Sequence, residues 1–208
     1  MNTVTVQEMK EIERIADASG LPYYQMMENA GTRSYETIMS SYPTADSLFI
    51  FCGKGNNGGD GLVVARLAAE NGIFACIILV EGEPVTKDAL ANYKKLPASV
   101  KILNVTDQNI KDLFKNYANP VIVDALYGTG FHGELRKDGT LACSLMNSLG
   151  APIVSLDLPS GCNADTREVS KGAVTADITV VFHAYKNLHV PAIKNCGTCR
   201  LVDIGIKS

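Results

Sequence analysis

Two acidic residues end apolar segments and a third lies in a glycine-rich stretch that follows one, and a carboxylate in such a place can act as an acid or base or can bind a cation. Asp60 lies in the glycine-rich stretch CGKGNNGGDG, Asp124 lies in PVIVDAL and Asp157 lies in PIVSLDL. A carboxylate at the end of an apolar strand is either exposed at a site or paired with another group. Asp124 and Asp157, with Asn57 and Ser160, offer only oxygen ligands, which favours a hard cation over zinc or iron. An N-cap is the alternative interpretation of Asp157, and on chemistry alone these residues do not favour a metal site over a site without metal.

The stretch GKGNNGGDG follows the apolar run SLFIFC and has the composition of a ligand-binding loop. Glycine at this density is expected to let the backbone adopt positive φ and approach a ligand closely. The side chains of Asn56, Asn57 and Asp60 add polar groups that a purely structural turn does not need. We therefore interpret this stretch as a loop that contacts a small ligand.

The same stretch matches the dinucleotide fingerprint GxGxxG, and Glu81 or Glu83 follows the next apolar run at the place of a ribose-binding acid. A nicotinamide-dependent oxidoreductase is therefore one alternative function. A single GxGxxG is weak support, however, and Asp60 would repel a pyrophosphate placed as in that fingerprint. A Walker-type phosphate loop fits less well, because no Gly-Lys-Ser/Thr follows.

A second polar loop, YGTGFHGE, follows PVIVDAL and offers backbone N–H groups with no cationic side chain among them. Successive N–H groups of this kind suit a bound phosphate. A plain strand-to-helix turn is the alternative interpretation. The candidate binding residues are Gly128, Thr129, Gly130, Phe131, His132, Gly133 and Glu134.

The six cysteines indicate a reduced protein, because several of them lie in apolar contexts typical of buried thiols. Cys196 and Cys199 form a CxxC with His183 and His189 upstream, so a structural zinc site is one alternative. A single CxxC whose inner residues are Gly-Thr is more typical of a turn into the last strand. Ser160 lies in PSG rather than in a GxSxG elbow, which disfavours nucleophilic catalysis.

Hydrophobic periodicity predicts the elements that must position these residues. Two helices come first, over about 5–20 and 22–42, because Thr5 and Glu8 have capping-box spacing and Pro22 favours a helix start. Apolar runs then alternate with helical segments. The predicted strands are 47–52, 74–80, 100–105, 120–126, 152–158, 176–182 and 199–205, and the predicted helices between them are 60–71, 87–96, 108–117 and 141–149.

This alternation predicts a single α/β domain over 1–208: a three-layer αβα Rossmann-like sandwich with a mostly parallel central sheet and two N-terminal helices. Continuous apolar strands such as FACIILV suit a parallel sheet with helices on both faces. Ligands of such sheets bind beyond the carboxyl ends of the strands. The polar endings of SLFIFC, PVIVDAL and PIVSLDL are therefore expected to meet over one edge.

The composition narrows the choice of partner. The 208 residues carry a formal net charge of -3, and 46% of them are hydrophobic. Because no basic block is present, the sequence disfavours nucleic acid and anionic lipid as partners. No apolar stretch approaches the roughly 20 residues of a membrane helix, and the N-terminal residues lack the apolar core of a signal peptide. We expect a cytoplasmic protein that binds a small molecule.

Six motifs, in order along the chain, resemble those of the NAD(P)H-hydrate epimerases. The combination of NNGGDG with DLPSG is quite specific to that family. The chain resembles the epimerase half of the bacterial bifunctional repair enzyme, as a stand-alone domain. The motifs are MMENAG at 26–31, GKGNNGGDGLVVAR at 53–66, DALYGTGFHG at 124–133, SLDLPSG at 155–161, KGAVTADITVVF at 171–182 and VDIGI at 202–206.

The resemblance implies an isomerase that interconverts the R and S epimers of hydrated NADH or NADPH at the hydroxyl-bearing ring carbon, a repair reaction, with a bound potassium ion. It also implies a homodimer and a functional link to a separate hydrate dehydratase. The potassium ligands at matching positions are Asn57, Asp124 and Ser160. The substrate-binding residues implied are Asn56, Asn57, Gly58, Gly59, Asp60, those at 128–134, and Asp157.

Asp157 is our candidate for the general acid and base near the reacting hydroxyl, with Asp60 or a water sharing the proton transfer. Two positions depart from the family pattern: Glu13 replaces a frequent Asp, and Tyr185 in HAYK replaces a proline. Lys186 in that segment either faces the site or is solvated. The main alternative function is a binding module without activity, but the intact NNGGDG motif favours catalysis.

Overall fold

A seven-stranded sheet runs through the centre of the structure, a computed structural model that describes residues 3–207. Its strand order is β3-β2-β1-β4-β5-β6-β7 and every neighbouring pair is parallel, whereas the sequence predicted a mostly parallel sheet. The strands are β1 (Ser47–Cys52), β2 (Phe74–Leu79), β3 (Lys101–Asn104), β4 (Pro120–Ala125), β5 (Ile153–Leu156), β6 (Ile178–Phe182) and β7 (Thr198–Val202). The helices are α1 (Val6–Ala18), α2 (Tyr23–Ser41), α3 (Asn56–Glu70), α4 (Lys87–Lys94), α5 (Ile110–Phe114), α6 (Lys137–Ser148) and the 3-10 turn η1 (Lys194–Cys196).

The two predicted N-terminal helices are confirmed. The capping box begins α1: the Glu8 backbone N–H donates to the Thr5 hydroxyl at 3.2 Å, and the Thr5 backbone N–H donates to the Glu8 carboxylate at 2.7 Å. The second helix begins directly after Pro22, whose ring holds φ at -59°. Local sequence signals therefore decide where both helices start.

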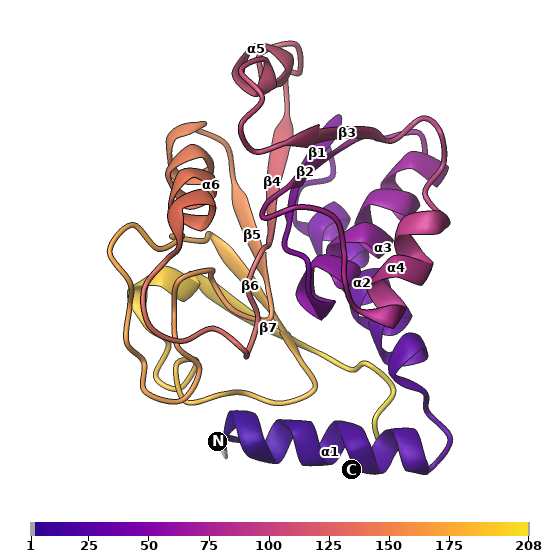
Figure 1. Ribbon diagram of the computed structural model, residues 1–208, viewed down its shortest axis with the longest axis vertical. Coiled ribbons are helices and arrows are strands. Elements are labelled where there is room, and N and C mark those ends of the chain that lie inside the picture. Colours follow the sequence, from indigo (N-terminus) through magenta and orange to yellow (C-terminus); the bar gives the residue numbers. More distant parts are fainter. Residues whose placement is uncertain (1–2, 208) are drawn as a thin grey trace.

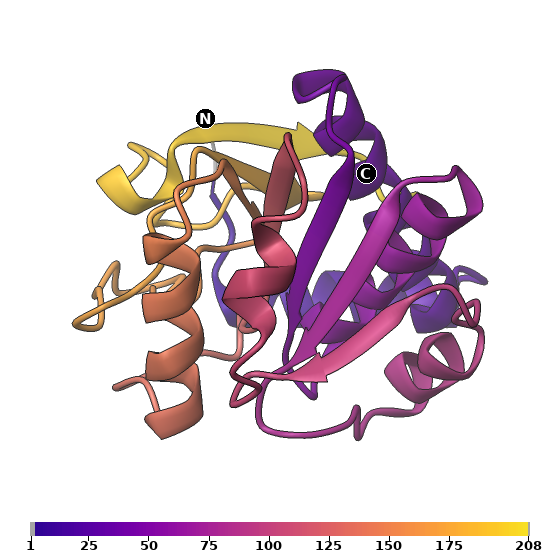
Figure 2. The same cartoon turned by 90° about the horizontal axis from the view of Figure 1, so that it is seen from above.

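Helices cover both faces of the sheet, as Figures 1 and 2 show, with α2, α3 and α4 on one face and α5 and α6 on the other. Alternate side chains of a strand serve the two faces: in β1, Ile50 belongs to the core on the α3 side, whereas Phe49 packs against Phe114 of α5 with ring centroids 4.9 Å apart. Burial on both faces explains the continuous apolar runs. The predicted three-layer Rossmann-like fold is confirmed.

The direction of the chain across the sheet reverses between β1 and β4. The first half proceeds from β1 through β2 to β3, and α5 then carries the chain back to β4 on the other side of β1. In open α/β sheets a ligand crevice forms at the carboxyl ends of the strands at such a switch point. Figure 1 shows α1 lying across this end of the sheet, where its residues Lys10 and Glu13 reach a cavity.

Several predicted boundaries are wrong by a few residues. The important one is α3, which begins at Asn56 instead of near Asp60, because Gly55 takes an extended N-cap conformation (φ -91°, ψ -164°) and the chain turns helical directly after it. Likewise α6 begins at Lys137, α5 has only five residues, and β5 is shorter than its apolar run. The polar residues from Asn56 to Asp60 therefore lie in the first turns of a helix rather than in a loop.

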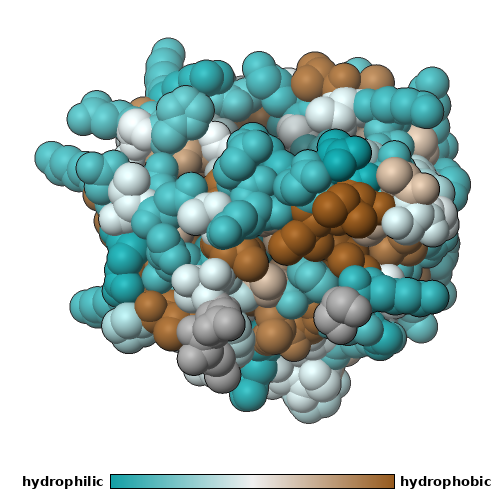
Figure 3. Space-filling model, turned by 90° about the horizontal axis from the view of Figure 1, so that it is seen from below, coloured by the Kyte–Doolittle hydropathy of each residue, from teal (hydrophilic) through white to brown (hydrophobic). Residues whose placement is uncertain are grey.

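Apolar side chains also reach the surface next to α1, on the face shown in Figure 3. Ile15 is 51% exposed, and a groove between α1 and the segment 205–207 is lined by Ile12, Ile15 and Ile206.

Within residues 3–207, no helix has both the length and the apolar character needed to cross a bilayer.

Candidate active site

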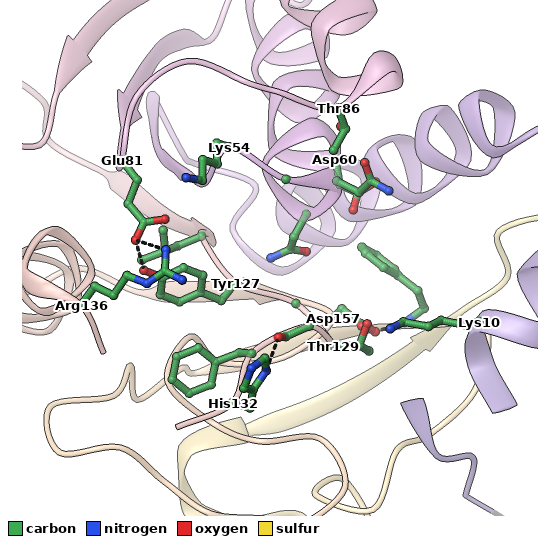
Figure 4. A pocket seen from close by; sticks show the side chains of 18 of the residues that line it. Lys10, Lys54, Asp60, Glu81, Thr86, Tyr127, Thr129, His132, Arg136 and Asp157 are labelled. Carbon is green, nitrogen blue, oxygen red and sulfur yellow. Dashed lines mark hydrogen bonds and ion pairs between the residues drawn. The ribbon is translucent and has the colours of Figure 1, made fainter. Parts of the chain in front are cut away.

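A cavity of 530 Å³ opens at the carboxyl ends of the strands, beside the switch point between β1 and β4. Its volume falls within the roughly 300–1,000 Å³ of small-molecule sites. Figure 4 shows that its walls come from α1, the start of α3 and the loops after β2, β4 and β5. The three polar strand endings therefore meet at one edge, as predicted. The predicted site residues that line the cavity are Asn56, Asn57, Asp60, Gly128, Thr129, Gly130, Phe131, His132, Glu134 and Asp157.

The glycines of the first stretch bring protein segments together, and the prediction that they adopt positive φ is wrong. A Cβ on Gly53 would lie 2.1 Å from the Leu126 carbonyl oxygen, and one on Gly58 would lie 1.8 Å from the Gly53 carbonyl oxygen. Only residues without side chains allow α3 to start so close to the ends of β1 and β4. Gly58 and Gly59, implied as substrate contacts, are buried in this packing and do not line the cavity.

The loop after β4 forms a second wall of the cavity. A turn closes it, in which the Phe131 N–H donates to the Gly128 carbonyl at 3.0 Å, and the Phe131 ring stacks on Tyr127 with centroids 5.2 Å apart. A Cβ on Gly128 would lie 3.3 Å from the Cβ of Asn57, so the two predicted polar segments touch. Gly133, with φ of +76°, is the one residue of 128–134 outside the lining.

Asp124 is fully buried and ties β4 to β5 and to the loop that follows β5. Its Oδ2 accepts from the Ser155 hydroxyl and the Ser160 N–H, both at 2.8 Å, and its Oδ1 accepts from the Ser160 hydroxyl at 2.6 Å and the Leu126 N–H at 3.3 Å. Burial raises the pKa of this carboxyl, although the hydrogen bonds oppose the shift. The Ser160 hydroxyl oxygen also accepts from the Tyr127 N–H at 2.9 Å. Asp124 and Ser160 thus hold the cavity wall from behind without lining it.

Asp157 faces the cavity just beyond the end of β5, with a φ of +62°. A non-glycine residue in this region costs on the order of 1 kcal/mol, and such residues cluster at functional sites. Lys186 Nζ donates to Asp157 Oδ1 at 2.5 Å, and the Phe182 N–H donates to the same oxygen at 3.3 Å. Within residues 3–207, Asp157 Oδ2 receives no hydrogen bond. The carboxylate is therefore fixed through one oxygen and open at the other.

Lys186 is 1% exposed, so the alternative that it is a solvated lysine is wrong. Its backbone N–H donates to His189 Nδ1 at 3.0 Å, which places the ring proton on Nε2, 3.0 Å from the Asp157 carbonyl oxygen that accepts it. Burial lowers the pKa of His189 to about 4, so the ring is neutral at pH 7. His189 and Lys186, neither of which lines the cavity, together support Asp157.

Asp60 lines the cavity from the first turns of α3. Burial raises its pKa well above the usual value, and the negative charges of Asp157 and Glu13 raise it further. Glu13, on α1, also has a raised pKa, owing first to burial and then to Asp157, while Lys186 opposes the shift. The cavity thus holds a carboxyl that favours its protonated form near an ion-paired carboxylate, an arrangement that separates an acid from a base.

All six cysteines are free. Between Cys196 and Cys199, Gly197 has a φ of +55°, and a Cβ there would lie 2.3 Å from the Asp177 carbonyl oxygen. The CxxC therefore forms the predicted turn into β7. In the described part of the chain, no three His, Cys, Asp or Glu side chains gather as a metal cluster.

Sequence reasoning missed several cavity residues that come from other elements. Glu13 follows the apolar Ile12 on α1, so its place at the edge of an apolar stripe was an available signal for a half-buried carboxylate. Nothing local distinguishes a buried Lys186 from a solvated one. The other missed residues include Lys10, Lys54, Thr86, Leu126, Tyr127, Arg136 and Phe182.

Comparison with curated proteins finds relatives along the whole chain. The NAD(P)H-hydrate epimerase of Elusimicrobium minutum is 32% identical in an alignment 213 residues long, which covers 99% of this chain and 96% of that protein. The bifunctional NAD(P)H-hydrate repair enzymes Nnr of Coxiella burnetii and Escherichia coli are each 38% identical, over 86% and 82% of this chain. The alignments cover only 36% and 32% of those longer proteins. The chain therefore spans about a third of the length of the bifunctional relatives.

A solved structure and a family model complete the comparison. The crystal structure of yeast ynu0 matches with a TM-score of 0.83 over 97% of this chain and 88% of that one, at 24% identity, which supports the fold alone. The family model for the YjeF-related protein N-terminus matches residues 23–188. This chain belongs to the family of the YjeF-related protein N-terminus.

Proposed function

We propose that this chain is an NAD(P)H-hydrate epimerase, which interconverts the R and S forms of hydrated NADH or NADPH at the hydroxyl-bearing ring carbon. The observation that carries the proposal is the presence of two unlike carboxyl groups in one cavity. Burial favours the protonated form of Asp60, whereas Lys186 balances the charge of Asp157. A relative aligned over nearly its full length bears this activity in its name.

The reaction asks for a proton donor and a proton acceptor. The ring nitrogen of the hydrate supplies electrons to the neighbouring carbon as the C–O bond breaks, and the hydroxyl takes a proton and leaves as water. Water then adds to the other face of the cationic ring and gives up a proton. No electrons are exchanged with a second substrate, and one proton is taken and one returned.

Asp60 and Asp157 fit these two roles. Asp60 donates the proton to the departing hydroxyl, and Asp157 accepts a proton through Oδ2, the oxygen that Lys186 leaves free. The roles exchange in the reverse direction. Phe182 lines the same cavity and presents an apolar surface to the ring.

The N-terminus of α3 supports binding of the pyrophosphate. Gly55, Asn56 and Asn57 line the cavity at this helix end, where unpaired N–H groups and the helix dipole favour anions. The protonated form of Asp60 carries no charge, so it does not repel the pyrophosphate as the ionised form would. Burial, which raises the pKa of Asp60, therefore lessens the misfit that weakened the dinucleotide fingerprint in the sequence.

We also propose that Asn57, Asp124 and Ser160 bind potassium, the ion implied by the resemblance. Within the described residues the buried Nδ2 of Asn57 has no partner, and turning the amide would present its oxygen there instead. Asp124 already accepts four hydrogen bonds, so it would join an ion by giving up the long one from the Leu126 N–H. The donors fit a hard cation in kind. Such an ion would supply positive charge where the two polar segments touch.

The decisive experiment mixes the purified chain with both hydrate epimers and a dehydratase that consumes only one of them. We expect the unconsumed epimer to disappear at a rate proportional to the concentration of this chain, and more slowly when tetramethylammonium replaces potassium. If the chain does not accelerate this disappearance, the epimerase proposal fails. An unchanged rate without potassium contradicts the cation proposal alone.

Three further proposals come from the sequence: a homodimer and a separate dehydratase that acts beside this chain, both taken from the resemblance, and a cytoplasmic location, taken from the hydropathy of the chain. Light scattering of the purified chain measures directly whether it forms a homodimer.

The alternative of a hydride-transferring oxidoreductase predicts a change in nicotinamide absorbance with an added substrate, which epimerisation does not produce.

A further inference from the structure

Glu81 lies on the side of the cavity away from Asp60, and the proposed proton transfers do not use it. It is the second residue after β2, has a φ of +67°, and its side chain lines the cavity while being only 12% exposed. Figure 4 shows Glu81 beside Tyr127 and Arg136, with Asp60 and Lys10 on the opposite side. A buried ionisable side chain at a cavity wall is a candidate for a functional residue.

Two contacts fix one oxygen of the Glu81 carboxylate. The Tyr127 hydroxyl donates to Oε1 at 2.9 Å, and Arg136 Nη1 lies 3.8 Å from the same oxygen. Arg136 is 77% exposed, so solvent screens its charge. Neither contact involves Oε2, which leaves that oxygen as an acceptor for a ligand in the cavity.

The loop that carries Glu81 is joined to the segment that starts α3. The Val80 N–H donates to the Cys52 carbonyl and the Val85 N–H donates to the Lys54 carbonyl, each at 2.9 Å. Glu81 lies between these two bonds. Its carboxylate therefore has a fixed position relative to the helix N-terminus at which we place the pyrophosphate.

The strand order defines the direction of an extended ligand. β2 and β5 lie on opposite sides of the central β1–β4 pair, so Glu81 and Asp157 mark the two ends of the crevice, with the start of α3 between them. A dinucleotide with its reacting ring at Asp157 and its pyrophosphate at α3 extends its other nucleoside toward Glu81. In doubly wound sheets, an acid at the end of the second strand accepts from the ribose 2′-hydroxyl.

We propose that Glu81 binds the ribose of the adenosine half and disfavours a 2′-phosphate there, so that the chain prefers hydrated NADH to hydrated NADPH. The choice of ligand rests on the proposed function. A 2′-hydroxyl donates to Glu81, whereas a 2′-phosphate places like charges together in a poorly solvated position. The repulsion between Glu81 and the 2′-phosphate lowers the affinity for the phosphorylated ligand at least about tenfold, because the exposed Arg136 offsets only part of it.

Calorimetry with ADP-ribose and its 2′-phosphate tests the ribose site without the reacting ring. The full chain in potassium buffer should bind ADP-ribose at least about tenfold more tightly. Glu81→Gln keeps an acceptor for Tyr127 and removes the charge, so the ratio should fall toward one. Glu83→Gln is the matched control, because Glu83 is exposed and outside the cavity lining. Thermal melting verifies that both variants are folded.

The outcomes separate this inference from the epimerase proposal. Equal binding of the two ligands by the wild-type chain, no binding of either, or an unchanged ratio in Glu81→Gln overturns the role of Glu81 even if epimerisation is observed. A preference for ADP-ribose that Glu81→Gln abolishes supports it, and this result stands even if the hydrate assay shows no epimerisation.

Discussion

Asp124 and Asp157 occupy similar places in the sequence and different places in the structure. Asp124 has no exposed surface and accepts four hydrogen bonds from neutral donors. Asp157 lines the cavity and is paired with the buried Lys186 through one oxygen. A carboxylate surrounded by neutral donors fixes the loops around it, whereas one paired with a buried cation through one oxygen keeps its other oxygen open for chemistry.

The register of the sheet explains the difference. Asp124 lies within β4 and is the partner of Ser155 in β5, so the neighbouring strand covers it. Asp157 comes two residues after Ser155, where β5 has ended at Leu156 and the backbone takes a positive φ. A shift of two residues in register, which places Asp157 one residue past the strand end, therefore separates a structural carboxylate from one that faces the cavity.

The largest expected effect is on catalysis, at Asp157. Asp157→Asn keeps the shape and an acceptor for Lys186 but cannot take up a proton, so the epimerisation rate should fall about 10²- to 10⁴-fold in the coupled assay. Circular dichroism should show a folded protein, although a less stable one, because Lys186 keeps a buried charge. Wild-type turnover in this variant would contradict the assignment of Asp157 as the residue that accepts the proton.

The next effect concerns the partner of Asp157. Lys186→Met leaves a buried carboxylate uncompensated, and the free energy of unfolding in urea should fall by about 3–5 kcal/mol. The double variant Asp157→Asn/Lys186→Met removes both charges and should recover most of that stability without recovering activity. Lys10→Met is the control, because Lys10 lines the cavity but is exposed. Equal stability of Lys186→Met and wild type would show that the ion pair does not hold Asp157.

Asp124 should respond through stability. Asp124→Asn turns an amide N–H₂ toward donors that now point at a carboxylate, so the free energy of unfolding should fall by about 2–3 kcal/mol. Ser155→Ala removes a single hydrogen bond to the same group and should cost only about 1 kcal/mol. If Asp124→Asn unfolds at the wild-type urea concentration, the four hydrogen bonds do not stabilise the fold.

The smallest effect is the pH dependence contributed by His189. Its pKa is about 4 in the folded chain and near 6.5 when unfolded, so between these values the unfolded state binds more protons and stability falls as the pH falls. The limiting slope is about 1.4 kcal/mol per pH unit, or about 2 kcal/mol by pH 5. His189→Gln should flatten this part of the profile measured by urea unfolding at pH 5 to 7. Identical profiles would show that His189 does not titrate as the structure indicates.

Much of the fold follows from the sequence because it rests on local or repeating signals. The capping box at Thr5 and the apolar run of β1 are confirmed, since both depend on neighbours in the chain or on burial of both sheet faces. The start of α3 was predicted four residues late because glycine and asparagine are typical of loops. Packing of α3 against β1 and β4 overrides that preference, and it requires the glycines that the sequence assigned to a ligand.

The sequence by itself determined the layered fold, the family, and the edge of the sheet where polar residues gather. Hydrophobic periodicity and strand order are properties of the chain, and parallel strands bring their polar endings to one edge. Only the tertiary structure decided the surroundings of each acid at that edge. Burial favours a protonated Asp60, four neutral donors enclose Asp124, and a lysine 29 residues away in sequence supports Asp157. Protonation depends on solvent exclusion and on charges brought together from distant segments, and the residue types alone predict neither of them.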